Sequence, residues 1–188
     1  ALAVFQVGLA MLVRPAASHG GAGLARCADQ AELGAALRAR QGPGYVSAYR
    51  DCRAADGYYR KYRVMFVDRQ PYPYHLAISS HWMVHYHCAG MLDASWKREE
   101  EARFLADPPA ELGGAAWSAL EALGRRLDLD YAGADFTLLP DGTVFVFEAN
   151  ATMLAHHERP DGPLAHKNPY VQRIIDAFGR LLEKHCPR

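Results

Sequence analysis

The sequence lacks several features that mark particular classes of protein. Its 188 residues include only four cysteines, Cys27, Cys52, Cys88 and Cys186, with no C-x-x-C pair. Such scattered cysteines argue against a zinc ribbon and a dense disulfide framework, and they favour reduced thiols in a cytoplasmic protein. An excess of one charge is also missing, because 21 Lys and Arg residues balance 21 Asp and Glu residues. We therefore expect neither nucleic acid nor a membrane surface as a partner.

The apolar run that opens the chain, residues 1–13, is too short to span a membrane as a helix. Gln6 and Gly8 interrupt it in a way that suits a strand. The stretch that begins at Arg14 could imitate the cleavage region of a signal peptide, but no basic residue precedes the run. We expect a buried strand over residues 4–13, in a chain whose upstream portion is missing.

Turn and cap signals divide the rest of the chain into mostly antiparallel hairpins with helices between them. This pattern predicts an α+β fold, with two lobes of mainly antiparallel sheets and flanking helices. A composition shift near residues 50–57 predicts a small lobe over residues 1–52 and a larger lobe over residues 53–188. The other expected strands are residues 45–49, 59–67, 71–78 and two within 133–150. The expected helices are residues 29–40, 93–106 with Asp93 as the cap, 117–127, and a last one from Asn168.

The most informative segment is residues 133–150, which is expected to form two strands around the turn at residues 140–142. One strand carries Asp135, and the other carries Glu148 and Asn150, which point the same way because strand side chains alternate. Glu148 follows four apolar residues, where a carboxylate without a partner is costly. Two carboxylates and an amide oxygen suit Mg²⁺ shared with a phosphate. The alternative is a hairpin with an acidic end and no ligand.

A second candidate motif lies in the expected strand 59–67. Lys61 and Arg63 are two residues apart and therefore share one strand face. Basic residues on an otherwise apolar strand suit the binding of phosphate or carboxylate groups. A solvated strand face is an equally good interpretation.

A third motif is a glycine-rich loop that follows Arg14. Its candidate ligand-binding residues are His19, Gly20, Gly21 and Gly23. Glycines let backbone N–H groups close on phosphate oxygens, and the histidine adds a donor. The loop has neither the Walker nor the Rossmann pattern, so a flexible connection is the alternative.

Histidines cluster at His81, His85 and His87. His85 and His87 are expected to share a strand face, where they could bind a transition metal. No third ligand follows at a typical spacing, although distant histidines could supply one in space: His156, His157 or His166. The preferred interpretation is that the cluster lines a substrate cleft or packs with neighbouring aromatic residues.

In this order, the motifs resemble the ATP-grasp superfamily of ATP-dependent carboxylate–amine ligases, in particular the glutamate-ligase and glutathione-synthetase-like members. The resemblance implies an ATP-grasp-like fold, with ATP and Mg²⁺, or Mn²⁺ in its place, as cofactors. It implies metal ligands at Asp135, Glu148 and Asn150. Nucleotide contacts are implied at Arg14, His19, Gly20, Gly21, Gly23, Ala48, Tyr49 and Asp51. Lys61 and Arg63 are the implied catalytic residues, and His81, His85 and His87 are candidate substrate contacts.

The implied activity is ligation of a small-molecule or peptide carboxylate to an amine through an acylphosphate. The implied partner is an upstream domain of the same polypeptide, because the resemblance covers the C-terminal part of such enzymes. Ala48 stands where the family often has an acid, and Arg14 where lysine is commoner. These departures favour the alternative of a non-catalytic module that binds nucleotide or a partner. A metal-dependent hydrolase that uses the histidine cluster is the third hypothesis.

Overall fold

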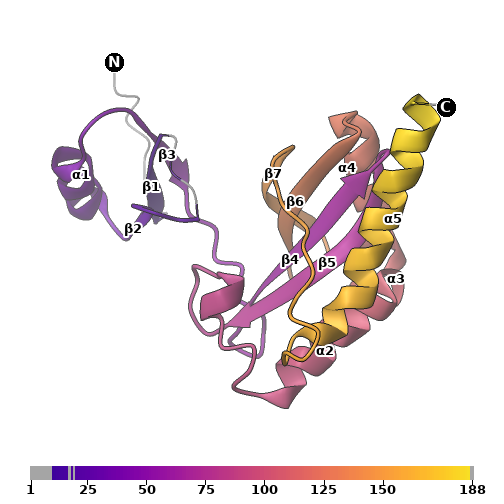
Figure 1. The fold of residues 1–188 in the computed structure, drawn as a ribbon. Helices are drawn as coiled ribbons and strands as arrows, with labels where there is room; N and C mark the ends of the chain where they lie inside the picture. Colours follow the sequence, from indigo (N-terminus) through magenta and orange to yellow (C-terminus); the bar gives the residue numbers. More distant parts are fainter. Residues whose placement is uncertain (1–9, 17, 19, 187–188) are drawn as a thin grey trace. The chain divides into compact units, whose positions relative to one another are not determined.

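The computed structural model describes residues 10–16, 18 and 20–186. The chain divides into two compact units, Ala1–Asp51 and Cys52–Arg188. Each unit contains an antiparallel sheet and at least one helix, so the expected α+β class is confirmed (Figure 1). Within the described ranges, no helix has the length and apolarity needed to cross a membrane.

In the first unit, the strand β1 (Met11–Pro15) pairs on both sides, with β2 (Ala25–Cys27) and β3 (Gly44–Ala48). The short strand β2 was not predicted, because three residues are too few to show a period. Of the strand expected over residues 4–13, residues 4–9 lie outside the described part of the chain.

The helix α1 (Gln30–Ala39) begins as its sequence predicts. The Asp29 carboxylate accepts a hydrogen bond from the backbone N–H of Glu32 at 2.8 Å. In return, the Glu32 carboxylate accepts one from the backbone N–H of Ala28 at 2.7 Å. These two bonds satisfy N–H groups that a helix start leaves without partners, which fixes where the helix begins.

The second unit is built on a four-stranded antiparallel sheet with the order β5-β4-β6-β7. Its strands are β4 (Tyr59–Val67), β5 (Gln70–Ser79), β6 (Tyr131–Leu138) and β7 (Val144–Asn150). Both hairpins predicted from the sequence are therefore confirmed. The central pair, β4 and β6, joins segments that lie about seventy residues apart, which no local pattern specifies.

Alternation along β4 separates two apolar cores. Tyr62, Val64 and Phe66 lie in a core formed with the helices that follow β5. Met65 and Val67 face the other way and pack against α5 (Asn168–His185), which crosses β4 and β5 in Figure 1. Because α5 covers only part of this second face, the portion around Lys61 and Arg63 carries polar groups instead.

The remaining helices are α2 (Ser95–Ala106), α3 (Pro108–Leu112) and α4 (Gly114–Leu127), with 3-10 turns η1 (Tyr86–Cys88) and η2 (Ala165–Lys167). The predicted cap of α2 by Asp93 is wrong: the N-cap is Ala94, with no side-chain hydrogen bond. Asp107 and the prolines end α2 as expected, and the Asp107 carboxylate then caps α3 by accepting from Ala110 N–H at 3.1 Å.

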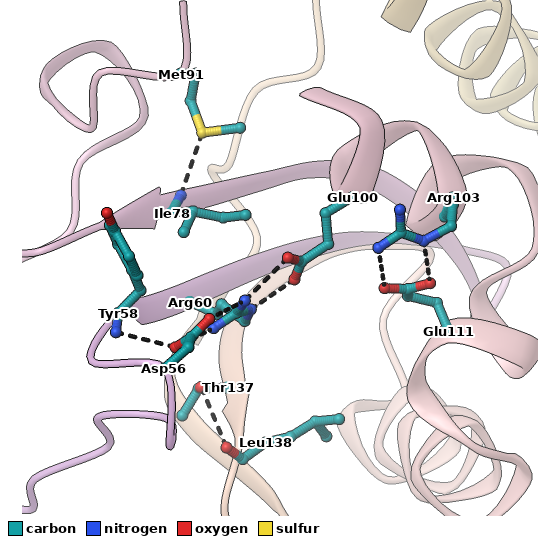
Figure 2. Close-up of polar contacts among 10 residues, drawn as sticks. All are labelled: Asp56, Tyr58, Arg60, Ile78, Met91, Glu100, Arg103, Glu111, Thr137 and Leu138. Atoms are coloured by element: carbon teal, nitrogen blue, oxygen red, sulfur yellow. Dashed lines mark hydrogen bonds and ion pairs between the residues drawn. The ribbon is translucent and has the colours of Figure 1, made fainter. Parts of the chain in front are cut away.

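The two edges of this sheet differ. The edge of β5 is covered, because the backbone N–H of Leu76 donates to the Glu101 carboxylate. Figure 2 shows the second such contact, in which Ile78 N–H donates to Sδ of Met91. The other edge is formed by β7, where Phe147 and Glu148 are both exposed. The expectation that Glu148 lies in a costly apolar setting is therefore wrong, because its apolar neighbours belong to an exposed edge strand.

Candidate functional site

A row of charged residues crosses the second sheet on the face that α5 leaves partly uncovered. Arg63 on β4 is the register partner of Asp135 on β6, and Asp135 is the register partner of Glu148 on β7. Residues directly opposite in an antiparallel sheet lie on the same face, with Cβ atoms about 5 Å apart. Strand pairing therefore brings together three side chains that are distant in sequence.

Both irregularities of the sheet fall at this row. The register between β4 and β5 shifts between Arg63 and Val64, and the register between β6 and β7 shifts between Asp135 and Phe136. Such shifts change the direction of side chains, and they concentrate beside functional sites. They set the Arg63–Asp135 row apart from the regular pairing on either side of it.

Asp135 is the centre of the site. Its carboxylate accepts two hydrogen bonds from Arg63, at 2.5 Å from Nε and 2.8 Å from Nη2. Nζ of Lys61 lies 2.9 Å from Oδ2 of the same carboxylate. The Asp135 side chain is only 2% exposed, so one buried carboxylate is held by two cations.

The electrostatics follow from this contact. Burial raises the pKa of Asp135, but the Arg63 hydrogen bonds and the charges of Lys61 and Arg63 outweigh burial, so the pKa is lowered. Burial lowers the pKa of Arg63, but Asp135 and the charge of Glu148 more than compensate, and the pKa is raised. Asp135 and Arg63 therefore hold each other in their charged forms.

The other two predicted metal ligands lie beside Asp135. Glu148 is exposed, and no hydrogen bond or ion pair to it occurs among the described residues. Asn150 lies opposite Gly133, two residues from Glu148 on the same face. Its Oδ1 accepts from the backbone N–H of Thr152 at 2.9 Å and from the Thr152 hydroxyl at 3.0 Å. Asn150 thus shapes the turn that follows β7.

These donors fit a hard divalent cation by their chemistry. Asp135 and Glu148 supply carboxylate oxygens from directly opposite positions, and the Asn150 amide oxygen is one step further along β7. Mg²⁺ is typically held by one or two carboxylates together with substrate phosphates. Lys61 and Arg63, which contact Asp135, are cations of the kind that bind phosphate groups in proteins.

Of the three candidate substrate histidines, His85 lies near the site. Burial and the charge of Lys61 lower the pKa of His85, while Asp135 and Glu148 act in the opposite direction. His81 and His87 are exposed, and His87 lines a shallow hollow with Tyr86. The strand expected to carry His85 and His87 is wrong, because His87 lies in the 3-10 turn η1.

The described ranges contain no group of three or more His, Cys, Asp or Glu side chains placed to hold a metal ion.

Several of the predicted nucleotide contacts lie in the glycine-rich loop of the first unit. Gly20, Gly21 and Gly23 all have positive φ, at 60°, 77° and 71°, a conformation that favours glycine. Arg14 stabilises the start of this loop, since its Nη2 donates to the Ser18 carbonyl at 2.6 Å. His19 lies outside the described residues.

The other predicted nucleotide contacts lie at the end of β3. Ala48 and Asp51 are exposed. The Tyr49 ring lies 4.1 Å from the guanidinium carbon of Arg26.

A buried polar cluster beside the site was missed from the sequence. Glu101 on α2 is fully buried, accepts from the Tyr86 hydroxyl at 2.9 Å, and lies 3.1 Å from Nε2 of His166. The His75 ring stacks on Tyr86 with centroids 4.8 Å apart. His75 is also the register partner of Arg63, which links this cluster to the charged row. The only sequence signal of this cluster is the single histidine of β5, His75, among mostly apolar and aromatic residues.

Lys167 adds a buried charge to the same cluster. Its side chain is 2% exposed. Its Nζ lies 2.6 Å from Oε1 of Glu158 and 4.0 Å from the ring centroid of Tyr86. Such partners offset the cost of burying a lysine side chain. The cluster therefore ties η2 and the segment after β7 to η1 and α2.

No family model and no curated protein matches the sequence. Two similar solved structures are an L-amino acid ligase from Bacillus licheniformis and a carboxyaminoimidazole ribonucleotide synthase from Aspergillus clavatus complexed with ATP. The first is 16% identical, with a TM-score of 0.43. The match covers 79% of this chain and 33% of the ligase chain. The second is 14% identical, with a TM-score of 0.47. The match covers 90% of this chain and 41% of the synthase chain.

This chain thus spans about one third to two fifths of the length of these structures. At such TM-scores neither likeness assigns a residue, a substrate or an activity. The resemblance to the ATP-grasp superfamily rests on the motifs of the sequence.

Proposed function

We propose that this chain is the ATP-binding part of an ATP- and Mg²⁺-dependent carboxylate–amine ligase. The observation that carries the proposal is the cross-strand row of Arg63, Asp135 and Glu148, with Lys61 on the same buried carboxylate. On this sheet face, the two cations suit a phosphate group and the two carboxylates suit a metal ion bound to it.

In this proposal, Lys61 and Arg63 bind the phosphate oxygens and balance the charge that develops during transfer. The guanidinium fork of Arg63 suits bidentate contact with a phosphate, as it does with the Asp135 carboxylate. Asp135, Glu148 and Asn150 hold the Mg²⁺ or Mn²⁺, which when bound neutralises phosphate charge and orients the phosphate.

The proposed reaction has two steps. A substrate carboxylate oxygen attacks the γ-phosphorus of ATP, which forms an acylphosphate and releases ADP. An amine then attacks the acyl carbon, forms the amide, and releases phosphate and a proton. Positioning and charge stabilisation carry most of such catalysis, so no nucleophilic side chain is required. His85 is the best-placed substrate contact, because it lies within electrostatic range of Lys61.

The residues predicted in the first unit are proposed as nucleotide contacts. The positive-φ glycines present backbone N–H groups in a loop that suits phosphate oxygens. Arg14 and His19 add positive charge or a donor, and residues 48–51 offer backbone groups for adenine.

The test is ADP release by the protein with panels of carboxylates and amines. We expect ADP release to require one member of each panel, and Glu148→Gln to abolish it, because the change removes a metal-binding charge without removing volume. Glu99→Gln, at an exposed position on α2, is the matched control and should retain the activity. ADP release at the wild-type rate in Glu148→Gln would contradict the assigned role of Glu148.

A non-catalytic nucleotide- or partner-binding module is the second candidate. It is favoured by the existing contacts of two proposed metal ligands, Asp135 with two cations and Asn150 with Thr152. If Mg-ATP binds but no combination of carboxylate and amine releases ADP, this candidate gains over the ligase.

A further inference from the structure

The two cations of the proposed phosphate site already have an anion of their own. Arg63 donates to both carboxylate oxygens of Asp135, and Lys61 contacts the second of them. The carboxylate is buried, whereas the Lys61 and Arg63 side chains are 16% and 20% exposed. The cations are thus reached from outside, while the anion that they hold lies beneath them.

An external phosphate and Asp135 use the same donors. A phosphate that takes the Nε and Nη2 fork of Arg63 must displace the Asp135 carboxylate from it. If Asp135 then lost both cations, a buried charge would remain without a partner, which is strongly unfavourable. A divalent cation at Asp135 and Glu148 would remove that penalty.

We propose that Asp135 competes with phosphate for Lys61 and Arg63 until a divalent cation takes over its carboxylate. Phosphate and metal consequently bind with positive coupling, because each relieves the cost of binding the other. The coupling is reciprocal, so the metal also binds weakly without phosphate. This inference rests on the proposed function in taking a polyphosphate as the anion.

The test uses Asp135→Asn and inorganic tripolyphosphate, titrated calorimetrically in EDTA and again in excess Mg²⁺. In EDTA the variant should bind tripolyphosphate roughly tenfold more tightly than the wild type, because the competing charge is gone. In excess Mg²⁺ it should bind roughly tenfold more weakly, because a metal ligand is gone. Comparing proteins in the same buffer cancels the affinity of Mg²⁺ for tripolyphosphate in solution.

The matched control is Glu100→Gln. Glu100 accepts from Arg60 at 2.5 Å and 2.9 Å on the opposite face of β4 (Figure 2). This pair has the same two-point contact as Asp135 and Arg63. This control should change neither titration. If Asp135→Asn weakens binding in both buffers, Asp135 only positions Arg63 and the inference is overturned. If binding in EDTA is unchanged, there is no competition, and the inference is overturned equally.

If Asp135→Asn does not fold, a measurement on the wild type tests the same coupling. The ¹⁵Nε resonance of Arg63, assigned by its loss in Arg63→Lys, reports the contact with Asp135. It should shift on addition of tripolyphosphate at lower concentrations in excess Mg²⁺ than in EDTA; equal midpoints would refute the coupling. A parallel titration of ATP in excess Mg²⁺ separates the two claims, since its failure alone would count against the proposed function and not against the anion site.

Discussion

Replacing Glu101 by alanine should destabilise the second unit more than any change at a surface glutamate. The carboxylate is fully buried and contacts three groups: Leu76 N–H at 3.1 Å, the Tyr86 hydroxyl at 2.9 Å and Nε2 of His166 at 3.1 Å. His166 is 30% exposed and can turn to water, so two buried donors are left without acceptors. At about 1–3 kcal/mol for each, the expected loss is about 4 kcal/mol.

The assay is urea unfolding followed by circular dichroism, with the free energy of unfolding extrapolated to water. A loss of about 4 kcal/mol is a large fraction of the roughly 5–15 kcal/mol that stabilises a typical domain. Glu99→Ala on the exposed side of the same helix should change stability by less than about 0.5 kcal/mol. A loss below about 1 kcal/mol in Glu101→Ala would refute the role of Glu101 as a shared acceptor.

Two further perturbations test the packing and the electrostatics of the second unit. Gly124→Ala should destabilise by about 1–3 kcal/mol in urea unfolding, because its Cβ would lie 2.2 Å from the backbone oxygen of Arg69; Gly179→Ala, with open space around it, should instead stabilise by up to about 1 kcal/mol. Burial holds the pKa of His75 well below 6.5, so the unfolded chain takes up the proton at a higher pH than the folded chain does. The free energy of unfolding should therefore be unaffected by His75 above about pH 6.5 and should fall below that pH by up to about 1.4 kcal/mol per pH unit. His75→Phe keeps a ring on Tyr86 and should remove this slope between about pH 5 and 6.5; an unchanged slope would show that another group causes it.

The strands and helices that could be predicted are those with a local signal. Apolar residues on either side of a polar turn mark β4 and β5, and the reciprocal bonds of Asp29 and Glu32 mark the start of α1. The sequence also placed Lys61 and Arg63 on one face, where both reach Asp135.

The contact between these cations and Asp135 could not be predicted, because it depends on the pairing of strands whose residues are 72 positions apart. The exposure of Glu148 depends on the place of β7 at the sheet edge, which is set by strand order and not by its own composition. Glu101 could not be separated from its two glutamate neighbours, because α2 buries charged residues as well as apolar ones. The features that could not be predicted therefore all depend on contacts between segments that are distant in sequence.

The central claim is that Lys61, Arg63, Asp135 and Glu148 form a site for metal-bound polyphosphate. Calorimetric titration of Mg-ATP into the wild type and into Arg63→Gln tests it most directly. We expect saturable binding at one site in the wild type and affinity lower by about tenfold or more in the variant, because the bidentate cation is lost. A folded wild type that binds no Mg-ATP would contradict the proposed function, which takes ATP as the polyphosphate, and an Arg63→Gln variant that binds Mg-ATP equally well would contradict the role of Arg63 in the site.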